Sequence, residues 1–173
     1  MRRVVYKCVL PAGFALAGFI IGFAAAACLD AAAFARFADR LGGYAFAVPE
    51  NAAWAEAFGK HMRAAILVWL LGFSRLAPQA AYAVCAGKAA ALGFVLALFG
   101  RVYGAVGVLY GLQYAGLQQM ILLLALVALA AACRMYAEGK LRLLWYGTAL
   151  GVYAMAAAFV AAVEAAGLPG LFL

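Results

Sequence analysis

Three polar residues, Arg75, Arg101 and Gln119, lie inside long apolar runs of the sequence. An arginine at the centre of a bilayer costs about 2.5–3.5 kcal/mol on insertion scales, so it normally faces the bundle interior and has a partner. Pro78 and the glycine-rich stretch GRVYGAVGVLYG (100–111) predict interrupted helices near both arginines. A broken helix is tolerated in a membrane only where protein or water satisfies its backbone. We therefore expect a buried polar feature, either an interior polar region or a re-entrant segment.

Other residues that could do chemistry are sparse. The one histidine, His61, stands beside Lys60 and close to Arg63, which favours a residue at a membrane boundary over a catalytic base. The cysteines are scattered singly, and we expect them to be small core residues. They are Cys8, Cys28, Cys85 and Cys133. The sequence contains no paired carboxylates, no cluster with metal-ligand spacing and no phosphate-binding loop. We expect a protein that is not an enzyme, with no catalytic residue, cofactor or metal.

Composition sets the class of protein that must hold these residues. The chain of 173 residues is 71% hydrophobic and 11% charged, whereas a soluble domain has about 25% charged residues. This composition therefore predicts an all-α integral membrane protein with a single membrane domain over residues 1–173. The formal net charge of +7 suits a bilayer with anionic lipid, and nucleic acid is not an expected partner.

Five apolar runs are long enough to be transmembrane helices, near residues 8–29, 64–87, 89–111, 117–133 and 143–166. The first run could instead be a signal peptide with a lipidated Cys28. A retained span is favoured because a signal core has only about 7–15 apolar residues, and because Ala25 occupies a position where lipidation sites usually have leucine. Glycine pairs at GxxxG spacing, including Gly18/Gly22, favour close packing within the chain, and a homo-oligomer stays open.

The longest polar stretch, residues 30–63, has a formal charge of zero. Its aromatic residues and leucine recur at helical spacing before Gly42-Gly43, which predicts a short amphipathic helix on the membrane surface. A turn and a second helix after Pro49 are expected to follow.

Basic residues predict the orientation, because lysine and arginine concentrate in cytoplasmic loops. With the N-terminus inside and the C-terminus outside, all of the topology-setting cations fall in the cytoplasm, and the segment 30–63 falls outside. Lys88 then occupies a tight cytoplasmic turn between the second and third spans. The cations concerned are Arg2, Arg3, Lys7, Lys88, Arg134, Lys140 and Arg142.

The order of several short motifs resembles the stage II sporulation protein M family over roughly residues 58–170. These are FGKHMRAAILVWLLGFS, then Pro78, GKAAALGF, LQQMILLLALVALAAA and VEAAGLP. The chain departs from the family at Gly87-Lys88, where the order of lysine and glycine is reversed. It also departs at 117–120, where LQQM replaces LPQN, and at Arg75, where the family is usually apolar.

The resemblance implies a five-span scaffold of the bacterial cytoplasmic membrane. Such a scaffold anchors cell-wall hydrolases, the stage II sporulation proteins D and P, during engulfment or septal remodelling. The segment 30–63 would be the partner surface, with Tyr44, Trp54 and Phe58 as apolar anchors; the alternative is a helix that rests on lipid. A purely structural role in septal remodelling, without stable hydrolase contacts, is a further alternative. Relatives of the family also resemble membrane subunits of ABC-type exporters, in which Arg75, Arg101 and Gln119 would line a substrate route.

Overall fold

The computed structural model describes residues 2–46, 54–74, 77–112 and 116–165. These residues form six helices and no strand, which confirms the all-α class. Side chains of residues 2–7, 40–46 and 77 are not described. The helices are α1 (Arg2–Ala27), α2 (Ala31–Phe46), α3 (Trp54–Leu71), α4 (Ala77–Gly111), α5 (Leu117–Ala137) and α6 (Leu143–Ala165).

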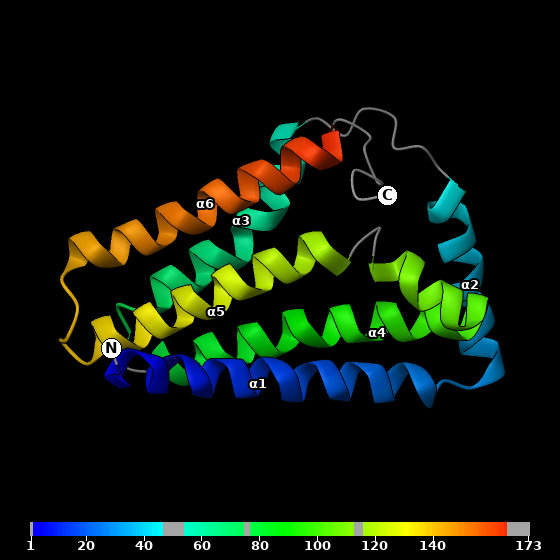
Figure 1. Ribbon diagram of the computed structural model, residues 1–173, viewed down its shortest axis with the longest axis horizontal. Helices are drawn as coiled ribbons and strands as arrows, with labels where there is room; N and C mark the ends of the chain where they lie inside the picture. Colours follow the sequence, from blue (N-terminus) through cyan, green and yellow to red (C-terminus); the bar gives the residue numbers. More distant parts are fainter. Residues whose placement is uncertain (1, 47–53, 75–76, 113–115, 166–173) are drawn as a thin grey trace.

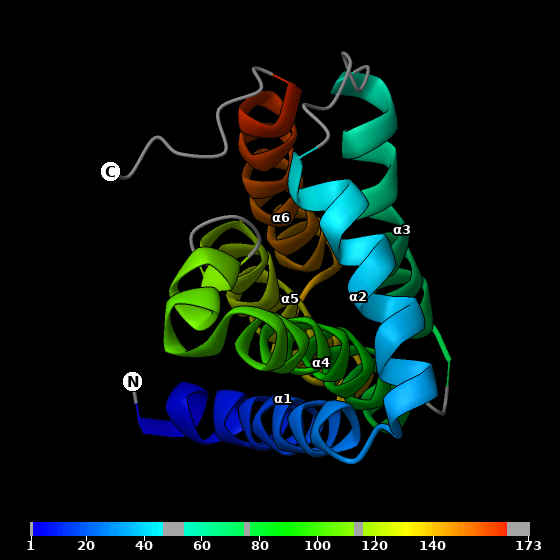
Figure 2. The same cartoon turned by 90° about the vertical axis from the view of Figure 1, so that its right-hand side faces the viewer.

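The long helices lie side by side and alternate in direction. Helices α1, α4 and α6 run one way, and α3 and α5 run the other way (Figure 1). Helix α2 stands across one end of this bundle, which we call the α2 end (Figure 2). The N-terminal part of α1, the C-terminal end of α3, the start of α4 and the α5–α6 connection lie at the opposite end (Figure 1).

The surface of the bundle indicates a lipid environment. Four helices are long and apolar enough to cross a membrane, over Cys8–Ala27, Pro78–Gly111, Leu117–Ala137 and Leu143–Ala165. Large apolar side chains point outward from them, including Ile21 at 66%, Leu124 at 71% and Leu144 at 76% exposure. The structure therefore supports a multi-pass membrane bundle. Helix α3 is not among these four, because its 18 residues include Glu56, Lys60 and Arg63.

The division of residues 64–111 differs from the prediction. Two spans, 64–87 and 89–111, were expected to meet at Lys88, but α3 ends at Leu71 and α4 begins at Ala77. Ser74 Oγ donates to the Leu71 carbonyl oxygen at 2.9 Å and helps to end α3. Pro78 suits the first turn of the next helix, where its missing N–H costs nothing. Lys88 therefore lies inside α4, and its assignment to a turn is wrong.

The polar stretch 30–63 is also divided differently. Helix α2 continues through Gly42-Gly43 to Phe46, so these glycines do not end it. Trp54 to Arg63 form the first part of α3, which packs along α6. Pro49 lies outside the described residues.

Helix α4 folds back on itself at Gly104, where φ is 65° and ψ is −152°. This region of backbone conformation is essentially restricted to glycine. A Cβ atom on Gly111 would lie 3.0 Å from Leu96 Cδ2, whereas 15 residues of straight helix would span about 22 Å. The interruption expected near Gly100-Arg101 is thus present three residues later, and residues 105–111 turn back against 96–103.

Helix α1 packs against α4 through glycines. A Cβ atom on Gly18 or Gly22 would collide with the backbone oxygens of Ala86 or Ala90, and one on Gly93 would collide with that of Phe19. The two backbones therefore touch directly, as GxxxG spacing favours. The main core lies between α3, α4, α5 and α6, around Val68, Leu126 and other buried residues.

Candidate functional site

A small pocket, which we call the polar pocket, lies between four helices; it is partly open, and Lys88 in its lining is exposed. Its polar lining consists of His61 from α3, Lys88 from α4, Gln119 from α5 and Tyr153 from α6. The remaining wall is leucine, at positions Leu92, Leu122, Leu123 and Leu126. The pocket has room for about one water molecule. Residues far apart in the sequence thus bring an ammonium, an amide, an imidazole and a phenol to one small pocket.

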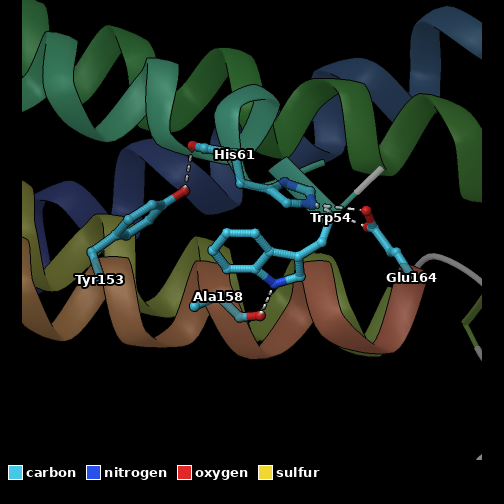
Figure 3. A network of polar contacts seen from close by, with 5 residues as sticks. All are labelled: Trp54, His61, Tyr153, Ala158 and Glu164. Carbon is cyan, nitrogen blue, oxygen red and sulfur yellow. Dashed lines mark hydrogen bonds and ion pairs between the residues drawn. The ribbon is translucent and has the colours of Figure 1, made fainter. Parts of the chain in front are cut away.

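His61 is held in place by contacts between α3 and α6 (Figure 3). Its Nε2 lies 3.1 Å from Oε1 and 3.2 Å from Oε2 of Glu164. The Tyr153 hydroxyl donates to the His61 carbonyl oxygen at 3.2 Å. The side chain is almost fully buried, with 7% of the residue exposed. The carboxylate of Glu164 accepts a hydrogen bond from Nε2–H of the neutral ring, and an ion pair forms when the ring is protonated.

Helical spacing explains why His61 faces α6. Positions 54, 58, 61, 65 and 68 recur at intervals of three or four residues, which places them on one face of α3. The Trp54 and Phe58 rings stack at 5.0 Å with an angle of 7° between their planes. Trp54 Nε1 donates to the Ala158 carbonyl oxygen at 3.2 Å. The sequence analysis placed His61 at a membrane boundary and did not predict its contact with Glu164 of α6. The spacing on α3 shows that His61 shares a face with apolar residues, but it does not show which helix covers that face.

Lys88 and Gln119 have unused donors. Among the described residues, neither side chain has an ion pair or hydrogen bond to another protein group. An unpaired lysine inside an apolar helix is costly unless its ammonium reaches the membrane surface or meets an anion. The structure places Gln119 in the lining of the polar pocket, together with His61, Lys88 and Tyr153.

Arg101 lies in different surroundings. Its Nη1 donates to the carbonyl oxygens of Ala26 at 2.6 Å and Leu29 at 3.3 Å. Its guanidinium lies over the Phe34 ring, 4.1 Å from the centroid. It therefore caps the C-terminal end of α1 and holds the start of α2, rather than lining a buried route with Gln119. Arg75 is outside the described residues, so its expected partners stay a prediction.

The expected partner surface is only partly open. Phe58 packs against the core that α3 shares with α5 and α6. Trp54 keeps 45% of its surface exposed while it hydrogen-bonds to α6. Tyr44 lies on α2, where its side chain is not described.

The remaining topology-setting cations lie on elements at one end of the bundle. Arg134 Nε is 2.8 Å from Glu138 Oε1, and Lys140 Nζ is 2.6 Å from Glu138 Oε2. Arg142 is exposed at the start of α6. Arg2, Arg3 and Lys7 belong to the first turns of α1, at the same end. Lys88 is separate from this group, because it lies inside α4.

In the described part of the chain, no group of three or more histidine, cysteine, aspartate or glutamate residues could hold a metal ion. No protein-family model, curated protein or solved structure matches the chain. The structure therefore supports a helical membrane bundle with a small polar pocket between four of its helices, and the role of the protein is a matter for proposal.

Proposed function

We propose that this protein is a non-catalytic scaffold of the bacterial cytoplasmic membrane. It holds cell-wall hydrolases at the membrane during engulfment or septal remodelling, as the resemblance to the stage II sporulation protein M family implies. The bundle crosses the membrane five times, through α1, α3, α4, α5 and α6, with the N-terminus inside and the C-terminus outside. The α2 end then faces the wall, and residues 105–111 form a re-entrant segment there.

The position of α2 is the observation that carries this proposal. The helix lies across the end of the bundle (Figure 2). Phe34 and Phe37 fix it to α4 and to the end of α1, and Phe37 meets Phe94 edge-on at 5.4 Å. Its exposed side, which includes Ala32, Arg36 and Asp39, is left open. An amphipathic helix in this place offers a partner a platform parallel to the membrane.

The test is cross-linking and capture of the tagged full-length protein from its own cells while septa form. Co-purification of enzymes that cleave peptidoglycan is the expected result. A double variant, Arg36→Glu with Asp39→Lys, exchanges the charges of α2 without changing its net charge and should abolish that capture. Arg142→Glu changes an exposed charge at the opposite end and serves as the control. Capture that survives the charge exchange would contradict the role of α2.

A second candidate function is that of a membrane subunit of an ABC-type transporter. The polar pocket between α3, α4, α5 and α6 favours it, because polar side chains inside a membrane bundle often mark a transport route. On this proposal the α5–α6 connection, with Glu138 and Lys140, would contact the ATPase. An ATPase that co-purifies, and is lost when residues 138–142 are replaced but not when α2 is altered, would favour this candidate over the scaffold.

A further inference from the structure

We propose that His61 and Glu164 form a pH-sensitive contact, which holds α3 more tightly against α6 when the imidazole ring takes up a proton. The contact lies at the α2 end of the bundle, where α3 begins and α6 ends (Figure 1). It rests on neither proposed function, since a scaffold and a transporter subunit each need α3 in its place.

The geometry of the two side chains suits a change of charge (Figure 3). His61 Nε2 lies 3.1 Å from Oε1 and 3.2 Å from Oε2 of Glu164. A carboxylate only accepts hydrogen bonds, so Nε2 carries the proton of the neutral ring. A second proton binds at Nδ1, and the hydrogen bond then becomes an ion pair. The Coulomb attraction of that pair is added to the hydrogen bond, and it is weakly screened because only 9% of the His61 side chain is exposed.

The ring also has a route by which a proton can reach it. Among the described residues, Nδ1 of His61 has no hydrogen-bond partner. His61 lines the polar pocket, which is partly open and has room for about one water molecule. The exposed Lys88 lines the same pocket. Water in this pocket would connect the buried ring with the solvent.

The other charges on α3 are more weakly placed than Glu164. Lys60 pairs with Glu56 at 2.9 Å, and both of these side chains are more than 60% exposed. Arg63 is exposed as well. The two cations oppose a positive charge on the ring, but water and salt screen them. Glu164 is the charged group in direct contact with the ring.

The helices packed against α3 add one further charge. From α4 the pocket receives Lys88, which is exposed and therefore also screened. From α5 it receives Gln119, which is uncharged. The Tyr153 hydroxyl of α6 donates to the backbone oxygen of His61 and not to its ring. A protonated ring therefore gains its main attraction from Glu164.

The remaining side-chain links between α3 and α6 keep their charge near neutral pH. Trp54 Nε1 donates to the Ala158 carbonyl oxygen, and the Tyr146 hydroxyl donates to the Trp69 carbonyl oxygen at 2.8 Å. An indole does not ionise, and histidine is the side chain that ordinarily changes charge between about pH 5 and pH 8. In the part of the chain that the structure describes, the link between α3 and α6 that can respond to pH in this range is thus the one between His61 and Glu164.

The test is a double-mutant cycle on the purified full-length protein in mixed micelles, at about pH 5.5 and about pH 8. The forms compared are the wild type, His61→Gln, Glu164→Gln and the double variant. Glutamine retains hydrogen-bonding groups at both positions but takes up no proton. We expect the contact to lower the unfolding equilibrium constant about fivefold more at the acid pH, because an ion pair replaces a hydrogen bond to a neutral ring. Arg142→Gln removes an exposed cation at the opposite end and should leave the effect of pH unchanged.

The charge of the ring can be observed directly. The chain has one histidine, so the ring signals of protein labelled with isotopic histidine, and purified without a polyhistidine tag, report on His61 alone in an NMR spectrum. We expect the ring to change from the neutral to the protonated form between the two pH values. This measurement separates a ring that stays neutral from a charged ring that adds no stability.

Three outcomes would overturn the proposal. The first is a ring that stays neutral at the acid pH, and the second is a contact of equal strength at both pH values. The third is a weaker contact at the acid pH, which would show that the cost of burying the charged ring exceeds the gain from the ion pair. If His61→Gln does not fold, Glu164→Gln gives an independent reading. Its loss of stability relative to the wild type should be larger at the acid pH, and equal losses would count against the contact.

Discussion

His61 and Glu164 meet across α3 and α6, with 3.1 Å between Nε2 and Oε1, although 103 residues separate them in the chain. This contact joins the most polar long helix to the last one. A contact between two partly buried groups makes their substitutions non-additive, and measured coupling energies for such pairs run from about 0.5 to 3 kcal/mol.

A double-mutant cycle should reveal this coupling. We expect His61→Ala and Glu164→Ala to destabilise the protein singly, and the double variant to lose about 1 kcal/mol less than the sum. The free energy of unfolding in mixed micelles is the measurement. Glu56 provides the control, because it pairs with Lys60 at 2.9 Å, so Glu56→Ala and His61→Ala should be additive. Full additivity at His61 and Glu164 would show that the contact carries no energy.

The contact between α1 and α4 depends on small residues. Gly22→Ala should lower the free energy of unfolding by about 1–3 kcal/mol, because the new methyl group would meet the Ala90 backbone oxygen. Gly13→Ala, on the same helix, has no atom within 4 Å of the added methyl group and should be neutral or slightly stabilising. Equal effects of the two substitutions in the same micelles would contradict direct backbone packing.

Arg101 should hold α2 in place. Arg101→Met removes the hydrogen bonds to Ala26 and Leu29 and the contact with Phe34, at a cost of about 1 kcal/mol for a partly exposed site. Amides of α2 should then exchange with deuterium faster, while those of α6 keep their protection. Arg142→Met removes an exposed cation at the other end of the bundle and should leave both helices unchanged. Unaltered exchange in α2 would show that other contacts hold it.

Cysteine labelling tests together whether α3 crosses the membrane and how the bundle is oriented. In a variant with the native cysteines replaced by alanine, a cysteine at Asp39 should react with an impermeant reagent on intact cells. A cysteine at Arg142 should react only after permeabilisation. Helix α3 lies between these positions in the chain, so both sites would label from the same side if α3 did not cross. The reverse pattern would show that the N-terminus is outside.

The starts of α5 and α6 could be predicted from the sequence, whereas the break between α3 and α4 was placed wrongly. Helices α5 and α6 begin at Leu117 and Leu143, as expected, because charged residues separate them. The run from 64 to 111 is apolar almost throughout, and of its three cations, Arg75, Lys88 and Arg101, the break was assigned to Lys88. The residues that mark the real break are Ser74 and Pro78, which act through hydrogen bonding and backbone geometry rather than through charge.

The candidate site was predicted less well, for a related reason. Arg101 and Gln119 were grouped because both are polar residues in apolar runs, but their neighbours come from helices distant in the sequence. In the structure, Arg101 hydrogen-bonds to the end of α1. Gln119 instead lines a pocket with His61, Lys88 and Tyr153. Hydrophobic periodicity shows which face of a helix is buried; it does not show which helix covers that face.

The packing of α3 against α6 also has a consequence for membrane insertion during translation. Helix α3 carries Glu56, Lys60 and Arg63, and such a segment enters lipid reluctantly on its own. Its contacts with Tyr153 and Glu164 of α6 are made through His61, and the ribosome synthesises α6 after α3, α4 and α5. We expect α3 to stay at the membrane surface during translation and to insert into the bundle only when α6 has left the ribosome. Synthesis of α6, rather than the hydropathy of α3, would then determine when α3 inserts.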